Sequence, residues 1–276
     1  MMVRIIGWFY LLGVVLVTQA FAAPPERIIS LAPNMTEILY ALGLEEKIVG
    51  VTSYCDMPPA AKEKPKVGGM SNPSLEAVVS LRPDLVVLTT DGNRPEFDVR
   101  LHSLGIATHV FRARQISDLP TGIRDLGPVL GVTAAADDLA SRIEGTVAQF
   151  RGAAHREAPQ KTALFIVWPE PAIVAGPGTA IDDALQLLGW RNAAGDVETE
   201  YPKYSVEEIL HRSPHVILIG KGHPNMREIS AGLLKKLEGL EAVREDRIYF
   251  TGDALYRLGP RVVEGIEELS RFLKQN

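Results

Sequence analysis

Apolar residues follow two alternating patterns along the chain: short continuous runs, and longer stretches in which they recur at helical spacing. The continuous runs predict buried strands at residues 27–31, 47–51, 84–88, 108–111, 162–167, 216–219 and 247–250. The stretches between them predict helices at residues 36–42, 74–81, 101–104, 180–188 and 262–274. Strands that alternate with helices are typical of mostly parallel sheets covered by helices. The chain is therefore expected to have an α/β fold.

End signals accompany these helices. Asn34 or Thr36 is expected to cap the first helix, because short polar side chains accept hydrogen bonds from free backbone N–H groups at a helix start. Gly43, Gly105 and Gly189 each follow a predicted helix and are expected to stop it.

The middle of the chain predicts one unusually long helix, from Thr133 to about His155. Its apolar residues recur at steps of four, four and three and form one stripe: Leu139, Ile143, Val147 and Phe150. A helix of about 22 residues is roughly 33 Å long, since each residue adds 1.5 Å. Such a helix can cross from one lobe to another, although an ordinary surface helix within one domain is the alternative.

A half-repeat flanks this helix. Residues 74–88 and 205–219 share a Ser, a Glu two residues later, a Pro nine residues after the Ser, and then a buried strand. A weaker echo pairs residues 36–43 with 181–189. In each unit the Ser is expected to cap a short helix and the Pro to end it.

The repeat suggests two related α/β lobes that face each other, with a ligand cleft between them. We expect an N-terminal lobe at residues 24–130, an interlobe helix at 131–156 and a C-terminal lobe at 157–276.

The first 22 residues predict a cleaved secretory signal peptide. Arg4 precedes an apolar run at residues 5–17, and residues 20–22 read Ala-Phe-Ala, which suits a signal peptidase. An uncleaved anchor is the alternative, although the run is short for a membrane span. Cysteine is absent near the cleavage site, so a lipid anchor is not expected.

Composition excludes several classes of function. Removal of the signal leaves 28 Lys and Arg against 34 Asp and Glu without a basic block, so nucleic acid is not an expected partner. Cys55 is the single cysteine, which predicts a small buried side chain and no disulfide or zinc site. The six His are scattered, and no metal site is expected. A P-loop and a Gly-x-Ser-x-Gly elbow are absent, although a secreted α/β hydrolytic enzyme stays open as a distant alternative.

Several short motifs together resemble one family. They are residues 29–37 (ISLAPNMTE), 53–58 (SYCDMP), 67–69 (VGG), 72–76 (NPSLE), 82–86 (RPDLV), 251–253 (TGD) and 257–261 (RLGPR). The chain resembles the periplasmic substrate-binding proteins of ATP-driven importers for vitamin B12, haem and ferric siderophores, and is most similar to their cobalamin-binding branch.

The resemblance implies two lobes with mostly parallel sheets, bridged by one long rigid helix. It also implies a monomer in the periplasm that is not an enzyme and holds no resident cofactor. Such a protein binds a small ligand, here cobalamin or a related corrinoid, and delivers it to a membrane permease with its ATPase subunits.

The resemblance also implies roles for particular residues. Glu76 and Glu207 would each dock onto arginine pockets of the permease, although each could instead only complement the positive end of its own helix. The residues expected to contact the ligand are Tyr54, Met57, Met70, Thr89, Asn93, Trp168, Tyr201, Asp253, Tyr256 and Arg257. Taken singly, Trp168 and Tyr256 also fit packing within a lobe.

Three of these positions leave other ligands open. The cobalamin branch commonly has aromatic residues where this chain has Met57, Met70 and Thr89, whereas Tyr201 keeps an aromatic ring. Haem would need an axial Tyr or His, for which Tyr54, Tyr201 and Tyr256 are candidates. A ferric siderophore would need basic residues in the cleft, and the candidates are Arg94, Lys203 and Arg257.

Overall fold

The computed structural model describes residues 23–153 and 161–275. The N-terminal lobe holds a parallel sheet in the order β2-β1-β3-β4. Its strands are β1 (Ile28–Ser30), β2 (Ile48–Val51), β3 (Leu85–Thr89) and β4 (Thr108–Phe111). Its α-helices are α1 (Pro33–Ala41), α2 (Leu75–Ser80), α3 (Pro95–Ser103) and α4 (Leu119–Leu130), and 3₁₀ turns lie at η1 (Glu45–Lys47) and η2 (Pro59–Glu63).

The C-terminal lobe holds a second sheet in the order β6-β5-β8-β9, and β7 also pairs with β5. Its strands are β5 (Thr162–Pro169), β6 (Ala172–Val174), β7 (Arg191–Asn192), β8 (Val216–Gly220) and β9 (Ile248–Thr251). Its helices are α6 (Ala180–Leu187), α7 (Val206–Arg212), α8 (Met226–Lys236), α9 (Glu241–Arg244) and α10 (Val262–Leu273). The α/β class with mostly parallel sheets is confirmed; β6 alone among these strands pairs antiparallel.

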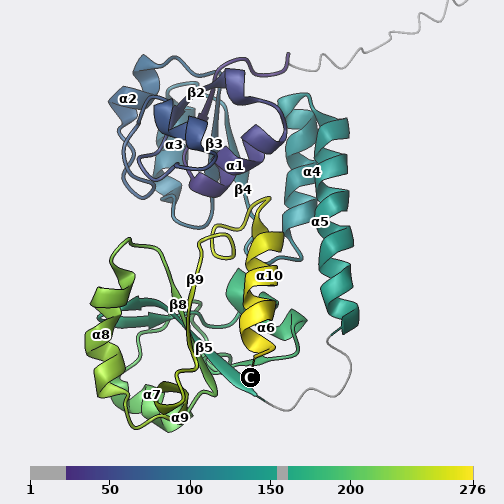
Figure 1. Ribbon diagram of the computed structural model, residues 1–276. Coiled ribbons are helices and arrows are strands. Elements are labelled where there is room, and N and C mark those ends of the chain that lie inside the picture. Colours follow the sequence, from purple (N-terminus) through teal and green to yellow (C-terminus); the bar gives the residue numbers. More distant parts are fainter. Residues whose placement is uncertain (1–22, 154–160, 276) are drawn as a thin grey trace, which may run out of the picture.

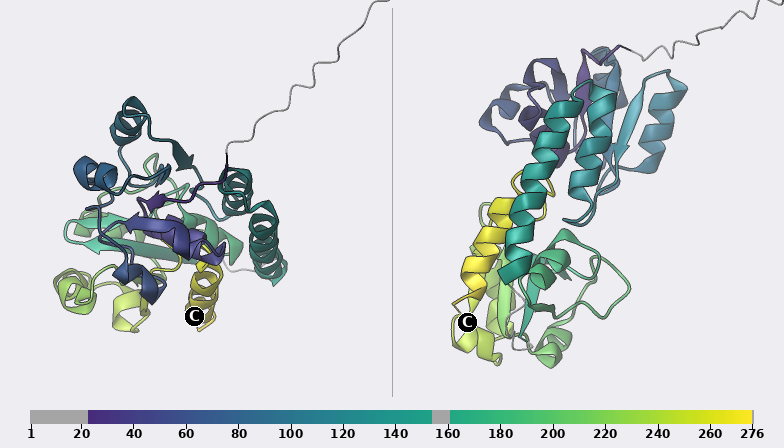
Figure 2. Two further views of the ribbon diagram at one scale, coloured as in Figure 1. Left: turned by 90° about the horizontal axis from the view of Figure 1, so that it is seen from above. Right: turned by 90° about the vertical axis from the view of Figure 1, so that its right-hand side faces the viewer.

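Helix α5 (Thr133–Ala153) runs along the side of the molecule, from the N-terminal lobe down to the C-terminal lobe (Figures 1 and 2). It packs on α4 of the N-terminal lobe and on α10 of the C-terminal lobe. One hydrophobic cluster runs from Met35 through Ile143 of α5 to Ile266 of α10, so the lobes and the helix share a core. The expected end of this helix near residue 155 lies outside the described residues, and the exact domain boundaries stay a prediction.

The predicted stripe on α5 explains this packing. Leu139, Ile143 and Val147 are buried, and Phe150 is half-buried against the same cluster. The opposite face carries charged residues that pair along the surface, as Arg142 does with Asp138.

The half-repeat is present in the structure. Ser74 Oγ accepts from Ala77 N at 3.2 Å, and Ser205 Oγ accepts from Glu208 N at 3.1 Å, so both residues cap the short helix that follows. The strands that follow, β3 and β8, occupy the third place in their sheets.

The two units also share an uncommon backbone feature. Arg82 and Ser213 have positive φ, +47° and +43°, and each lies directly before the Pro of its unit. Proline disfavours the right-handed helical conformation for the residue before it, so both helices end here in the same left-handed turn.

Two details of the N-terminal lobe differ from or extend the prediction. The predicted caps of α1 are wrong: Ala32 is the N-cap and Pro33 occupies the first turn, where its fixed φ suits a helix start. Thr36 lies inside the helix and donates to Ser30 Oγ at 2.8 Å.

Cys55 is buried with its sulfur 3.1 Å from the hydroxyls of Thr36 and Thr52, which confirms its interpretation as a packing residue.

No helix within residues 23–153 and 161–275 combines the length and apolarity that a membrane span needs.

Candidate functional site between the lobes

The carboxyl ends of several strands meet between the two lobes. Residues that follow β1, β2 and β4 in the N-terminal lobe contact residues that follow β7 and β9 in the C-terminal lobe. For example, Asn34 Nδ2 donates to Leu258 O at 3.3 Å, and Arg114 Nη1 to Glu200 Oε1 at 2.5 Å. Ligands of open α/β sheets bind outside the carboxyl ends of the strands, so this boundary is the natural place for a site.

Five charged residues form a network across the boundary, which we call the interlobe charge cluster. Glu37 and Asp56 come from the N-terminal lobe; Asp253, Arg257 and Arg261 come from the C-terminal lobe. Arg261 bonds to both oxygens of Glu37, at 2.8 and 2.7 Å, and to Asp253 at 3.1 Å. Arg257 lies 2.9 Å from Asp253 and also donates to Asp56. The cluster thus ties the lobes together with two guanidinium groups and three carboxylates.

Burial and ion pairing shift the pKa values of two carboxyl groups in this cluster in opposite directions. Glu37 is only 5% exposed, and burial raises the pKa of its carboxyl despite the hydrogen bonds and charge of Arg261. The hydrogen bond from Arg261 to Glu37 raises the pKa of Arg261 in turn. Partial burial would raise the pKa of Asp56, but the hydrogen bond and charge of Arg257 outweigh it and bring that pKa below 3.8. Both arginines therefore stay charged and fixed.

A cavity of about 530 Å³ adjoins this cluster. Three residues of the cluster line this cavity, Asp56, Asp253 and Arg257, and so does Tyr256, which precedes Arg257 in the sequence. Burial raises the pKa of Tyr256 to about 12, and its buried hydroxyl has no hydrogen-bond partner in the described structure. The rest of the lining comes from Phe250 and from the segment that follows β8: Lys221, Gly222, His223, Pro224, Met226 and Arg227.

The structure thus brings together three of the predicted ligand contacts, Asp253, Tyr256 and Arg257, around one cavity. Sequence reasoning missed Asp56, although it lies within the Ser-Tyr-Cys-Asp-Met-Pro motif, and it missed the segment after β8. The signal for that segment was its place at the carboxyl end of a buried strand.

Two predicted aromatic contacts lie exposed, one on each lobe. Tyr54 is 63% exposed and Tyr201 is 41% exposed, and they are the exposed aromatic side chains among the large hydrophobic residues of the described chain. Tyr54 lies two residues before Asp56, and Tyr201 directly follows Glu200, so both adjoin side chains that bond across the lobes. Desolvation by the surrounding protein and the nearby carboxylates of Asp91 and Glu200 raise the pKa of Tyr201.

Two other predicted contacts have their polar groups engaged within the N-terminal lobe. Asn93 Nδ2 donates to Leu31 O at 2.9 Å and to Met70 O at 2.8 Å, while its Oδ1 accepts from Thr89 N at 2.8 Å. Thr89 is 2% exposed and offers no surface to a ligand in this structure. Asn93 therefore ties three loops together, and the contact of these two residues with a ligand stays a prediction.

The remaining predicted contacts are half-buried. Met57 and Met70 each keep part of the side chain exposed, and Met70 packs against the N-terminal core. Trp168 packs on the C-terminal core and donates its indole N–H to Glu170 O at 2.8 Å; it does not line the cavity beside the charge cluster. Their contacts with a ligand stay predictions.

The two predicted docking residues are equivalent in the two lobes. Glu76 and Glu207 lie exposed in the first turns of α2 and α7, which Figure 1 shows on opposite ends of the molecule. Hydrogen bonds from its own backbone N–H and from Ser205 lower the pKa of Glu207. Neither carboxylate forms an ion pair with a cation of residues 23–153 or 161–275.

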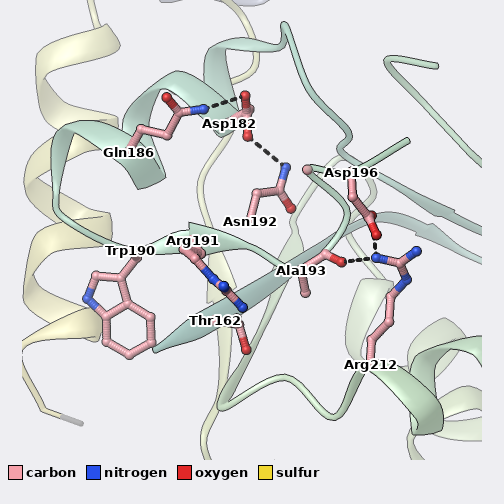
Figure 3. A pocket seen from close by; sticks show the side chains of 10 residues that line it. Thr162, Asp182, Gln186, Trp190, Arg191, Asn192, Ala193, Asp196 and Arg212 are labelled. Atoms are coloured by element: carbon pink, nitrogen blue, oxygen red, sulfur yellow. Dashed lines mark hydrogen bonds and ion pairs between the residues drawn. The ribbon is translucent and has the colours of Figure 1, made fainter. Parts of the chain in front are cut away.

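A second cavity, of about 490 Å³, lies away from this boundary at the start of β5 (Figure 3). Its polar side chains satisfy one another: Asp182 accepts from Asn192 at 3.0 Å and from Gln186 at 2.8 Å, and Arg212 bonds to Asp196 and to Ala193 O. A network closed on itself is typical of structural support rather than of a ligand site.

In the part of the chain that the structure describes, no three His, Cys, Asp or Glu side chains converge as metal ligands.

Comparisons with known proteins agree on the kind of molecule. The family model for periplasmic binding proteins matches residues 28–255. The vitamin B12-binding protein of Vibrio cholerae is 30% identical over 260 residues, which is 91% of this chain and 90% of that protein. An uncharacterized ABC transporter substrate-binding lipoprotein of Bacillus subtilis is 32% identical over 90% of this chain and 80% of its own length.

Solved structures with two different ligands in their names match about equally well. The periplasmic vitamin B12 binding protein of Vibrio cholerae superposes with a TM-score of 0.79 at 28% identity, over 91% of this chain and 98% of that one. The periplasmic heme-binding protein of Roseiflexus superposes with a TM-score of 0.83 at 29% identity, over the same shares.

Proposed function

Because the chain belongs to the periplasmic binding protein family, we propose that it captures cobalamin or a related corrinoid between its lobes and delivers it to an importer. The family match confirms the resemblance drawn from the sequence motifs, and with it the general role of a solute-binding protein of ABC importers. The identity of the ligand is the proposal.

One observation carries the corrinoid proposal: an exposed tyrosine stands on each lobe at the boundary, Tyr54 and Tyr201. A corrinoid is a broad, flat ring with apolar faces and amide side chains around its rim. Aromatic rings cover such faces well, and polar groups such as Asp253 and Arg257 suit the amides. Relatives named for vitamin B12 support the same ligand.

Haem is the second candidate, and a specific feature favours it. Tyr54 and Tyr201 are exposed at the boundary between the lobes, so phenol groups are at hand for an axial bond to iron. The superposition on the heme-binding protein of Roseiflexus supports this alternative.

The rest of the cycle follows from this role. The chain is exported by a signal peptide cleaved after Ala22 and acts in the periplasm as a monomer, without a resident cofactor and without turning over its ligand. The loaded protein docks on the permease through Glu76 and Glu207, one on each lobe.

Native mass spectrometry tests this proposal. The mature protein is mixed with equal amounts of cyanocobalamin and hemin, and bound ligand is then released and weighed. A 1:1 complex with cobalamin, released unchanged, is the expected result. A complex with hemin alone favours the second candidate. A chemically altered ligand contradicts a binding protein and revives the hydrolytic alternative.

A further inference from the structure

The segment that follows β8 carries basic side chains that form no ion pair within the described residues. Lys221, His223 and Arg227 are all exposed, and they line the cavity beside the interlobe charge cluster. Within the described residues, neither Lys221 nor Arg227 forms an ion pair, in contrast to Arg257 and Arg261. The chain as a whole has a net charge of −5, so this local excess of positive charge stands out.

The carboxylates of the cavity do not neutralise these cations. Asp56 and Asp253 bond to the arginines of the charge cluster, Asp56 to Arg257 and Asp253 to both Arg257 and Arg261. The charges left over on the cavity wall are therefore those of Lys221 and Arg227, with His223 between them in the sequence.

Packing against the protein holds Arg227 in place at the cavity wall. The Arg227 guanidinium lies over the Phe250 ring, 4.2 Å from its centroid, which holds the charge at the cavity wall. Helix α8 begins at Met226, whose N–H donates to His223 O at 3.2 Å, and Asn225 gives the helix no side-chain cap. The positive end of α8 thus adds to the charge of Arg227.

A third feature calls for a hydrogen-bond partner in the same cavity. The buried Tyr256 hydroxyl has none in the described structure, and it lies close to Gly222, where an added Cβ would stand 3.5 Å from it. Buried hydroxyls are normally satisfied, so this hydroxyl is available to a ligand group once the Tyr256 side chain turns it toward the cavity that the residue lines.

We propose that Lys221, His223 and Arg227, with the Tyr256 hydroxyl, form a subsite for an anionic oxygen group of the transported ligand. The inference rests on the proposed function, which places the ligand between the lobes. In cobalamin the matching group is the phosphodiester of the nucleotide loop; in haem it is the pair of propionate carboxylates. The subsite selects for charge at one edge of the ligand, whereas Tyr54 and Tyr201 cover its faces.

Titration calorimetry with matched ligands tests the subsite. Cyanocobalamin carries the phosphodiester and dicyanocobinamide lacks it; hemin carries free carboxylates and hemin dimethyl ester does not. The Lys221→Gln/Arg227→Gln variant is compared with wild type, and Arg100→Gln/Lys235→Gln, which removes two exposed charges elsewhere, is the control. Because the variant loses charge-assisted hydrogen bonds, we expect its affinity for cyanocobalamin to be roughly tenfold to a hundredfold lower than that of wild type. Its affinity for dicyanocobinamide, and the affinity of the control variant for cyanocobalamin, should stay unchanged.

The outcomes separate the subsite from the identity of the ligand. If the variant binds cyanocobalamin as wild type does, the subsite is wrong and the corrinoid proposal stands. If wild type binds hemin alone, and the variant weakens hemin but not its dimethyl ester, the subsite is right and the corrinoid proposal is wrong. If the variant weakens charged and uncharged ligands alike, or wild type binds none of the four, the subsite is overturned.

Discussion

Arg261 and Glu37 are joined by two hydrogen bonds, at 2.8 and 2.7 Å, although they lie 224 residues apart and belong to different lobes. Glu37 is in α1, and Arg261 is the N-cap residue of α10. Because Arg261 also holds Asp253, which in turn holds Arg257, the pair both fixes the lobes and positions an arginine at the cavity. With α5 along the side, these bonds leave the lobes little freedom to hinge.

Removal of one partner should therefore destabilise the fold. In Glu37→Ala, Arg261 keeps its buried charge but loses two of its bonds, and breaking a buried pair in this way costs about 3 kcal/mol. We expect the free energy of unfolding, from urea titration, to fall by about that amount. Glu46→Ala, an exposed site, is the control and should change little. A loss as small as that of the control would contradict the role of the pair.

The same carboxyl should give the stability a distinct pH dependence. Burial raises the pKa of Glu37 above 4.5, so the folded chain takes up a proton at higher pH than the unfolded chain does. Stability then increases as the pH falls through the folded pKa toward 4.5, and gains nothing more below that. The difference in unfolding free energy between wild type and Glu37→Gln should shift in favour of wild type on acidification from pH 7 to 4.5. A shift in the opposite direction would mean that pairing outweighs burial.

Arg257 should be needed for ligand affinity because of its geometry as well as its charge. Its guanidinium bonds to Asp56 and Asp253 at once, which the single ammonium of Lys cannot reproduce. Arg257→Lys is expected to weaken ligand binding roughly tenfold, and the double variant Asp253→Ala/Arg257→Ala to weaken it further. Fluorescence titration of the purified variants measures this. Unaltered affinity in the double variant would remove both residues from the site.

Docking should depend on the two equivalent glutamates without affecting ligand capture. Glu76→Lys/Glu207→Lys reverses the charge on both lobes and is expected to abolish uptake by a reconstituted importer, while ligand affinity stays at the wild-type value. Each single variant should retain part of the uptake. Glu46→Lys/Glu264→Lys provides a matched reversal of two other surface charges. Normal uptake by the first double variant would leave both residues as simple helix-end charges.

Much of the fold could be predicted from the sequence, because its signals are local. The buried strands are continuous apolar runs, and the Ser and Pro of the half-repeat act within a few residues of the helix that they bound. Helix α4 escaped prediction because Pro and Gly interrupt it. Pro120 is tolerated in the first turn, where its missing N–H is not needed, and Pro128 lies near the end of the helix.

The charge cluster and the cationic wall could not be predicted in the same way. Glu37 and Arg261, or Asp56 and Arg257, are brought together only when the two lobes are placed against each other. The predicted contact Thr89 shows a different problem: the family resemblance implied a cleft residue there, but the structure buries its side chain. Family motifs identify the edges of the cleft, whereas the direction of each side chain depends on packing.

Calorimetric titration of the mature protein with cyanocobalamin tests the central claim most directly, run beside hemin and repeated with Tyr54→Ala/Tyr201→Ala. Val99→Ala, at another exposed apolar side chain, is the control. The account predicts that wild type binds cobalamin saturably at 1:1 and binds hemin more weakly. The affinity for cobalamin should be at least about tenfold lower in the tyrosine variant and unchanged in Val99→Ala. No heat from cobalamin with wild type, or the same affinity in the tyrosine variant, would contradict it.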